Sequence, residues 1–149
     1  NQAIETTLNI IWNELRYKAQ VDKDFENLPP VRCFPQKISQ VFMNLLINAA
    51  QAIEDKGRIY ITTRMVNRES QDRDRFVQIR ISDTGSGIPK TILDKIFDPF
   101  FTTKPVGQGT GLGLSIVYEI IKAHNGRIDV VSRPGKGTRF TLHLPVTGP

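Results

Sequence analysis

The sequence has few of the features that mark secreted or membrane-inserted proteins. It contains one cysteine, Cys33, so no internal disulfide can form, which fits a reducing compartment. We expect Cys33 to act as a small buried hydrophobic residue. No apolar run approaches the roughly 18 residues that a membrane span requires, and no secretory signal pattern opens the chain. We therefore expect no membrane insertion, and the helical character of the first residues suggests a piece of a longer protein.

No block of basic residues stands out, although the formal net charge is +5. Lys and Arg are scattered and alternate with acids, as in RESQDRDR at positions 68–75. Because no basic stretch is interleaved with aromatic residues, the sequence argues against a nucleic-acid surface. A polyphosphate ligand and ordinary solvated surface both remain as interpretations of the charge.

Common motifs of other nucleotide and catalytic sites are also absent. The chain has no G-x-x-x-x-G-K-[ST] loop and no strand–G-x-G-x-x-G–helix unit, which excludes P-loop and Rossmann sites. The triplet Asp83-Thr84-Gly85 occurs once, whereas an aspartic protease needs two such carboxylates. There are no internal repeats and no low-complexity segments.

Apolar periodicity divides the chain into helices and strands. Ile4, Leu8, Ile11 and Leu15 have helical spacing and predict an amphipathic helix within residues 1–20. A second apolar stripe predicts a helix from Gln36 toward Gly57. Strands are predicted near 21–28, at 58–66 and 75–82, and in a closing hairpin at 127–134 and 138–145. A third helix is expected over 111–124, ended by Asn125-Gly126.

These elements suit one domain, residues 1–149, that is large enough to bury a core. Helices and strands form separate groups along the chain, which predicts helices on one face of a mixed, mostly antiparallel sheet. The expected fold class is therefore an α/β (α+β) two-layer sandwich. Residues 83–110 show little regular pattern, and an ordered irregular segment of that length is usually functional.

The predicted second helix carries a polar strip beside its apolar stripe. Asn44 and Asn48 are four residues apart and share a face, which Gln51 and Asp55 extend. An amide oxygen is suited to complete a magnesium shell made mostly of water and phosphate. A solvated helix face explains the same pattern without any ligand.

The stretch SDTGSGI at 82–88 places a carboxylate directly before two glycines. Asp83 ends a predicted strand, so the backbone turns sharply beneath its side chain. A carboxylate at the rim of the core can accept a hydrogen bond from an exocyclic amine such as that of adenine. Thr138, on the last predicted strand, is placed to support that site.

Four glycines fall within residues 107–113 and are followed at once by an apolar helix. A glycine-rich loop that leads into a helix start brings free N–H groups and a partial positive charge to phosphate. Lys104 stands nearby as a cation for phosphate oxygens. A flexible loop before a helix is the alternative.

Taken in order, the motifs resemble one known family. NLLINAAQA, DTGSGI, FDPFFTT and GTGLGLSI are similar to the N box, first glycine box, F box and second glycine box of bacterial sensor histidine kinases. These kinases share a superfamily with gyrase, mismatch-repair ATPases and heat-shock chaperone ATPases. The ending GRIDVVSRPGKGTRFTLHLP resembles the family's closing hairpin, so the resemblance covers essentially the whole chain.

The resemblance implies that ATP and Mg²⁺ are bound here. Asn48 would coordinate magnesium, Asp83 would bind the adenine amine with support from Thr138, and Asn44 would lie near the phosphates. Residues 84–110 would form a lid over the nucleotide, anchored by Phe97 and Phe100. The other nucleotide-binding residues that the resemblance implies are Gly85, Gly87, Ile88, Thr103, Lys104, Gly109, Thr110, Gly111, Leu112, Gly113 and Leu114.

Two positions bear on the branch of the superfamily. ATP-hydrolysing members have a glutamate base four residues before the magnesium-binding asparagine, and here that position is Asn44, which has no basic pKa. This favours a kinase over an ATPase. Many family kinases have a lysine at the position of Gln51, and we expect Lys104 to supply that charge, as in members resembling nitrogen-regulation sensor kinases.

The implied activity is transfer of the γ-phosphoryl group of Mg-ATP to a histidine on a separate dimerisation domain, with Asn44 and Lys104 as the catalytic residues. His124 and His143 lie in no phosphoacceptor motif, so the acceptor hairpin is expected outside these 149 residues. The implied partners are that domain and a response regulator, in the cytoplasm, in a parent that is either anchored to a membrane or free. An autonomous ATPase switch and a non-enzymatic binding module are the alternatives.

Overall fold

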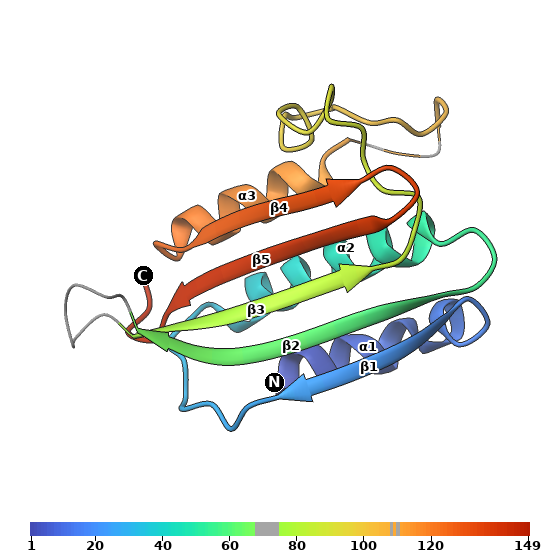
Figure 1. Cartoon of the computed structure of the whole chain (residues 1–149). Helices are drawn as coiled ribbons and strands as arrows, with labels where there is room; N and C mark the ends of the chain where they lie inside the picture. The colour runs from blue at the N-terminus through green and yellow to red at the C-terminus, as the bar shows by residue number, and fades with distance from the viewer. Residues whose placement is uncertain (68–74, 108, 110) are drawn as a thin grey trace.

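The computed structural model describes residues 1–67, 75–107, 109 and 111–149. Within these residues, three helices cover one face of a five-stranded sheet and leave the opposite face open (Figure 1). The predicted α/β two-layer sandwich is therefore confirmed. No helix in the described part of the chain is long and apolar enough to cross a membrane.

Each helix buries the stripe that its periodicity predicts. Helix α1 (Gln2–Leu15) buries Ile4, Leu8, Ile11 and Leu15. Helix α2 (Pro35–Ala52) begins with a proline, whose fixed φ suits a first helical position, and packs against both other helices. Helix α3 (Gly113–Ala123) ends where Asn125 adopts a left-handed φ of 56° and the N–H of Gly126 returns to the carbonyl of Ile121. The predicted Asn-Gly ending is thus confirmed.

The strands follow the order β1-β2-β3-β5-β4. Strand β1 (Ala19–Phe25) runs parallel to β2 (Gly57–Asn67), and the remaining pairs are antiparallel. The last strand, β5 (Gly137–Pro145), lies between β3 (Arg75–Asp83) and β4 (Arg127–Arg133). This insertion places Thr138 directly opposite Asp83.

Alternation along the strands decides what enters the core. Val77, Ile79 and Ile81 of β3 are buried, as are Phe140, Leu142 and Leu144 of the neighbouring β5. Gln78 and Arg80 point to the other face, as the pattern predicts. Cys33 is a free thiol that is partly buried and packs against the core, close to the expected small hydrophobic role.

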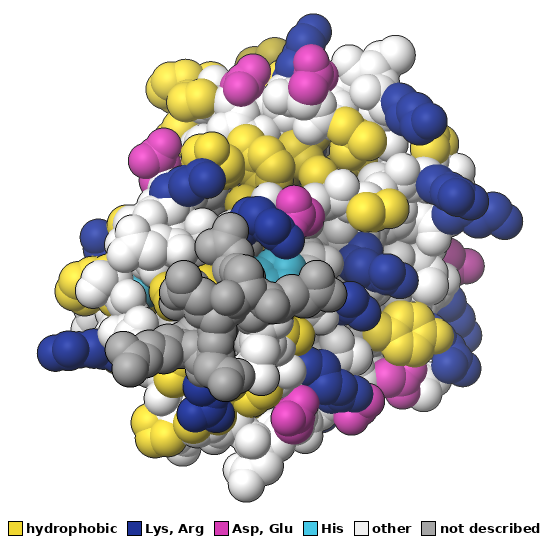
Figure 2. Space-filling view, turned by 60° about the vertical axis from the view of Figure 1, so that its left-hand side comes forward, with side chains coloured by type: hydrophobic (Ala, Val, Ile, Leu, Met, Phe, Trp, Pro, Cys, Tyr) yellow, Lys and Arg dark blue, Asp and Glu magenta, His cyan; other side chains and the backbone are white. Residues whose placement is uncertain are grey.

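On the face that Figure 2 shows, Lys and Arg side chains stand among apolar, acidic and uncharged ones. Exposed ion pairs such as Lys23–Glu5 and Arg127–Asp129 use part of the positive charge. Pairs of this kind add little to stability, so the scattered charge that the sequence shows is mainly solvated surface.

Candidate functional site

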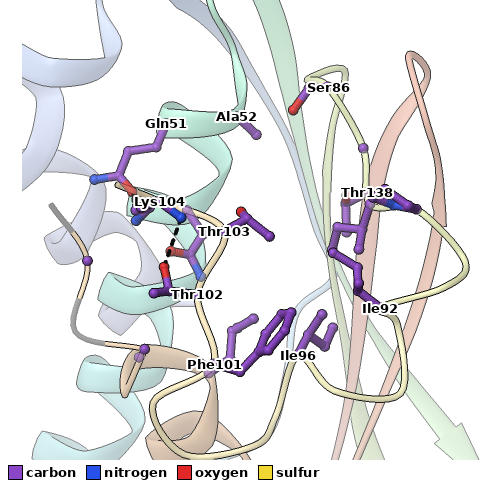
Figure 3. Close-up of a pocket in the computed structure, with 18 of the residues that line it drawn as sticks. Gln51, Ala52, Ser86, Ile92, Ile96, Phe101, Thr102, Thr103, Lys104 and Thr138 are labelled. Carbon is purple, nitrogen blue, oxygen red and sulfur yellow. Dashed lines mark hydrogen bonds between the residues drawn. The ribbon is translucent and has the colours of Figure 1, made fainter. Parts of the chain in front are cut away.

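A cavity of about 560 Å³ opens at one end of the sandwich, where α2 and β3 end and α3 begins. Its wall also includes the irregular segment that follows β3 and the start of β5 (Figure 3). Segments far apart in the sequence meet here because the ends of α2 and β3 and the starts of α3 and β5 lie at the same end of the sandwich (Figure 1). The predicted site residues that line it are Asn48, Asp83, Gly87, Ile88, Thr103, Lys104, Gly109, Gly111, Gly113, Leu114 and Thr138.

Asp83, the last residue of β3, is held by the backbone on both sides. Its Oδ1 accepts a hydrogen bond of 2.8 Å from the N–H of Gly85, and its carboxylate also accepts one from the backbone N–H of Thr138. Partial burial raises the pKa of this carboxyl above its ordinary value, and the two N–H groups oppose that rise. The result is an oriented acceptor at the rim of an apolar pocket.

The two glycines after Asp83 have different roles. A Cβ on Gly85 would lie 2.5 Å from the carbonyl oxygen of Ala52, so glycine here allows the turn to pack on the end of α2. Gly87 has φ +74°, and a Cβ there would lie 2.1 Å from the carbonyl oxygen of Arg133. Gly85 therefore supports the cavity from behind, and only Gly87 lines it.

Helix α2 presents Asn48 and Gln51 to the cavity, one turn apart. Asn44 lies one turn earlier and does not line the cavity. Its Nδ2 donates a 3.2 Å hydrogen bond to the carbonyl of Gly113, which joins α2 to the start of α3. The expected position of Asn44 near the phosphates stays a prediction, and in this structure its amide supports the wall from behind.

The irregular segment brings a cation over the same wall. The ammonium of Lys104 donates a hydrogen bond to the side-chain oxygen of Gln51, a residue of α2; Figure 3 shows both side chains at the cavity wall. The backbone N–H of Lys104 donates to the hydroxyl of Thr102, which shapes the local turn. A positive charge therefore stands beside the amide groups of α2.

The aromatic residues of the segment divide into anchored and exposed rings. Phe97 packs against Tyr118 of α3 and Phe140 of β5, with ring centroids 5.6 and 6.4 Å apart. Phe100 is 74% exposed and has a φ of 66°, so its ring lies outside the packed core. The expectation that Phe100 anchors the segment is wrong, because the ring that turns into the cavity belongs to Phe101.

The glycine-rich stretch before α3 packs closely against the backbone of the preceding segment at Phe100. Gly111 has φ +68°, and a Cβ there would lie 2.3 Å from the carbonyl carbon of Phe100. Leu112 is the N-cap residue of α3 and does not line the cavity. Helix α3 begins at Gly113, so its first N–H groups lie at the cavity wall, where a helix start favours anions. Thr110, also expected to bind nucleotide, lies outside the described residues.

Neither histidine is part of the cavity wall. His124 is 1% exposed, and its Nε2 accepts the N–H of Phe34 at 3.0 Å while its Nδ1 lies 2.7 Å from the carbonyl of Ile120. It therefore ties the end of α3 to the start of α2. Burial and, next, the nearby Arg127 lower the pKa of His143.

Comparison with known proteins identifies the family. The model of the histidine kinase-, DNA gyrase B-, and HSP90-like ATPases matches residues 34–148. The chain belongs to that family. Its resemblance to sensor histidine kinases, expected from the four boxes, is confirmed by its relatives.

Two curated relatives of this histidine kinase-, gyrase B- and HSP90-like ATPase come from Escherichia coli strain K12. Sensor histidine kinase ZraS is 41% identical over 133 residues, which are 89% of this chain and 26% of ZraS. Signal transduction histidine-protein kinase AtoS is 42% identical over 149 residues, which are 98% of this chain and 23% of AtoS. The chain spans about a quarter of the length of these relatives.

A solved structure agrees with the fold. The catalytic domain of histidine kinase ThkA, in a nucleotide-free form, superposes with a TM-score of 0.81 at 33% identity. The match covers 99% of this chain and 92% of the solved one. The arrangement of sheet and helices is therefore that of a histidine kinase catalytic domain.

Several lining residues of this family member were not predicted from the sequence. Apolar Ile92, Ile96 and Phe101 form the floor, and Ser86 and Thr102 add hydroxyl groups. Ile92 and Ile96 follow Ile88 at intervals of four residues, and this spacing is the local signal that could have marked them as residues of one face.

Proposed function

We propose that this chain binds Mg-ATP and presents its γ-phosphoryl group to a histidine on a separate dimerisation domain of a longer sensor kinase. One observation carries the proposal: a single cavity joins an oriented carboxylate, Asp83, to a wall formed by Asn48, Lys104 and the start of α3. The carboxylate suits an amine of a nucleobase, and the wall suits a polyphosphate. Family membership and kinase relatives support the same conclusion.

The nucleobase end of the proposed site is built around Asp83. Its carboxylate accepts the exocyclic amine of adenine, and Ile88 and Ile96 provide apolar contact for the ring. Gly87 keeps the turn clear of β4, while Thr138 supports Asp83 from the opposite strand.

Three kinds of group form the phosphate end of the proposed site. Lys104 contributes a charge, the start of α3 contributes backbone N–H groups, and the side-chain oxygen of Asn48 would coordinate Mg²⁺. Among the described residues no cluster of three His, Cys, Asp or Glu side chains is placed to hold a metal ion. One amide suits Mg²⁺ that receives its other ligands from phosphate and water, and the bound ion neutralises phosphate charge.

The domain assignment follows from the same reasoning. Residues 1–149 form the catalytic ATP-binding domain, and residues 84–110 form its lid. His124 is buried and holds two backbone groups, and neither it nor His143 lines the cavity, so neither is placed to receive a phosphoryl group. The acceptor histidine therefore belongs to another domain, the phosphate passes next to a response regulator, and the parent kinase presents this domain to the cytoplasm, where ATP is available.

An autonomous ATPase switch is the competing function. It requires a general base that activates water, and the amide of Asn44, occupied with Gly113, offers none. The geometry therefore favours a kinase module that waits for its acceptor. A non-enzymatic module would use the same cavity for another ligand.

Calorimetric titration of Mg-ATP into the chain separates these functions. Binding heat that decays to baseline is the expected result, and sustained heat after each injection would instead identify an ATPase. Absence of heat at several temperatures would overturn ATP binding. Repeating the titration with Asn48→Ala, with and without Mg²⁺, tests the metal assignment: the substitution is expected to weaken binding only when Mg²⁺ is present. Equal weakening in both conditions would refute that role.

A further inference from the structure

Ser132, a residue of β4 that does not line the cavity, connects three parts of the proposed nucleobase site. It is 8% exposed, and its Oγ accepts the N–H of Ile88 at 2.7 Å. The same Oγ lies 2.9 Å from the carbonyl oxygen of Gly137 and 2.8 Å from the Oγ1 of Thr138. One buried hydroxyl thus links the first glycine turn to the start of β5.

Proton accounting decides the direction of these bonds. A serine hydroxyl has one proton, and the carbonyl of Gly137 is able only to accept, so that proton goes to Gly137. The N–H of Ile88 is able only to donate, so Ser132 accepts from it. For the third contact Thr138 must therefore be the donor. The hydroxyl proton of Thr138 is used on Ser132, and its Oγ1 has only lone pairs left for the cavity.

Thr138 and Asp83 then present the same polarity. Thr138 is 6% exposed and lines the cavity, and Asp83 is its direct partner across the two strands. A carboxylate and an acceptor-only hydroxyl side by side form an environment that accepts hydrogen bonds and offers none. A purine with an amine at position 6 supplies two N–H donors, whereas a 6-oxo purine presents an acceptor there.

We infer that Ser132 is a positioning residue that orients the Thr138 hydroxyl away from the ligand, and that this orientation makes the site select 6-amino over 6-oxo purine nucleotides. The inference rests on the proposed function, because it concerns the nucleobase end of the same cavity. Whether Thr138 reaches the amine directly or through one water, the polarity argument is the same, since a water that donates to Thr138 can accept from the amine.

The two substrates that test this are ATP and inosine triphosphate, which differ in the group at position 6. The unsubstituted chain should prefer ATP by about tenfold or more. The 6-oxo group of inosine triphosphate would face two acceptors, Asp83 and Thr138, and would find no donor there. Ser132→Ala frees the Thr138 hydroxyl to rotate and donate to the 6-oxo group. The preference should then fall by about fivefold, in addition to any common loss from the freed N–H of Ile88.

Two further variants separate positioning from a general structural effect. Ser82→Ala removes a serine hydroxyl that contacts Arg139 outside the cavity, at 3.2 Å, and should leave the preference unchanged. Thr138→Val removes the hydroxyl that Ser132 orients, so it should lower the preference by itself. Adding Ser132→Ala to Thr138→Val should then change the preference no further.

The outcomes are distinguishable. A reduced ATP preference in Ser132→Ala, with no further change in the double variant, supports the inference. If Ser132→Ala weakens the binding of ATP and of inosine triphosphate equally, the inference about Ser132 is overturned, while the proposed ATP-binding function stands. If the unsubstituted chain binds neither nucleotide, the proposed function fails and this inference fails with it. If Ser132→Ala does not fold, the effect of Thr138→Val on the preference decides the matter.

Discussion

The carboxylate of Asp83 accepts a hydrogen bond of 2.8 Å from the backbone N–H of Gly85, two residues further along the chain. Burial nevertheless raises the pKa of Asp83, because the loss of hydration outweighs the two N–H contacts. A group that binds its proton more tightly when folded makes its ionised form a cost to stability. The ionised carboxylate of Asp83 is therefore the form that would accept the nucleobase amine and also the form that lowers the stability of the fold.

For Asp83→Asn we expect two results. ATP affinity should fall by about tenfold or more, because a charged acceptor for the amine is lost. The free energy of unfolding of the variant, relative to the parent, should rise as pH rises through the pKa of Asp83, since only the parent then carries an ionised buried carboxyl. Thermal unfolding at pH 4 and pH 7 measures this, and a difference that is independent of pH would contradict the assigned cause.

Lys104→Met tests the charge at the phosphate end. If Lys104 faces the terminal phosphate, ATP affinity should fall by about tenfold while ADP affinity changes much less. Lys90→Met removes a lysine from the same segment that does not line the cavity, so it is the matched control. Equal losses for ATP and ADP would place Lys104 elsewhere along the nucleotide.

Gly87 and Gly135 form a natural pair for an alanine comparison. Both have nearly the same φ, +74° and +75°, but a Cβ on Gly135 meets nothing within 4 Å. Gly135→Ala should therefore cost only the left-handed backbone, about 1–2 kcal/mol. Gly87→Ala adds the collision with Arg133 and should cost about 3 kcal/mol or more. Urea unfolding of both variants checks this, and similar values would show that β4 yields easily.

His124→Phe removes the acceptor for the N–H of Phe34 while keeping an aromatic ring of similar size. The free energy of unfolding should fall by about 1–3 kcal/mol, the cost of a polar group left without a partner. His143→Phe provides the comparison, because the Nε2 of that ring is hydrogen-bonded to a side chain, that of Gln78. A smaller effect there is expected. If His124→Phe were neutral, its link between α2 and α3 would not contribute to stability.

Much of the fold was predictable because burial leaves a periodic record in the chain. The spacing of Ile4, Leu8 and Leu15 reports the buried side of α1, and the alternation around Ile79 reports the buried side of β3. Ends of elements were predicted less well: the first predicted helix extended to residue 20, whereas α1 ends at Leu15 and β1 begins at Ala19. The competing strand there is decided by pairing with β2, which local spacing does not report.

Some residues of the candidate site were likewise predictable from local sequence, and others were not. The boxes around Asn48, Asp83 and Gly113 are local motifs, so the order of the residues alone is enough to find them. Phe100 and Phe101 are adjacent and identical residues, yet Phe100 has a left-handed backbone and an exposed ring, whereas Phe101 lines the cavity.

By itself the sequence determined the family, the kinds of element and most of the residues around the cavity, since local spacing and side-chain chemistry carry that information. Tertiary structure alone decided that β5 enters between β3 and β4, so that Thr138 meets Asp83. It also placed the Ser132 hydroxyl within hydrogen-bond distance of three partners, namely Ile88, Gly137 and Thr138. Such contacts depend on which strands become neighbours, and strand order is set by the packing of the whole sheet.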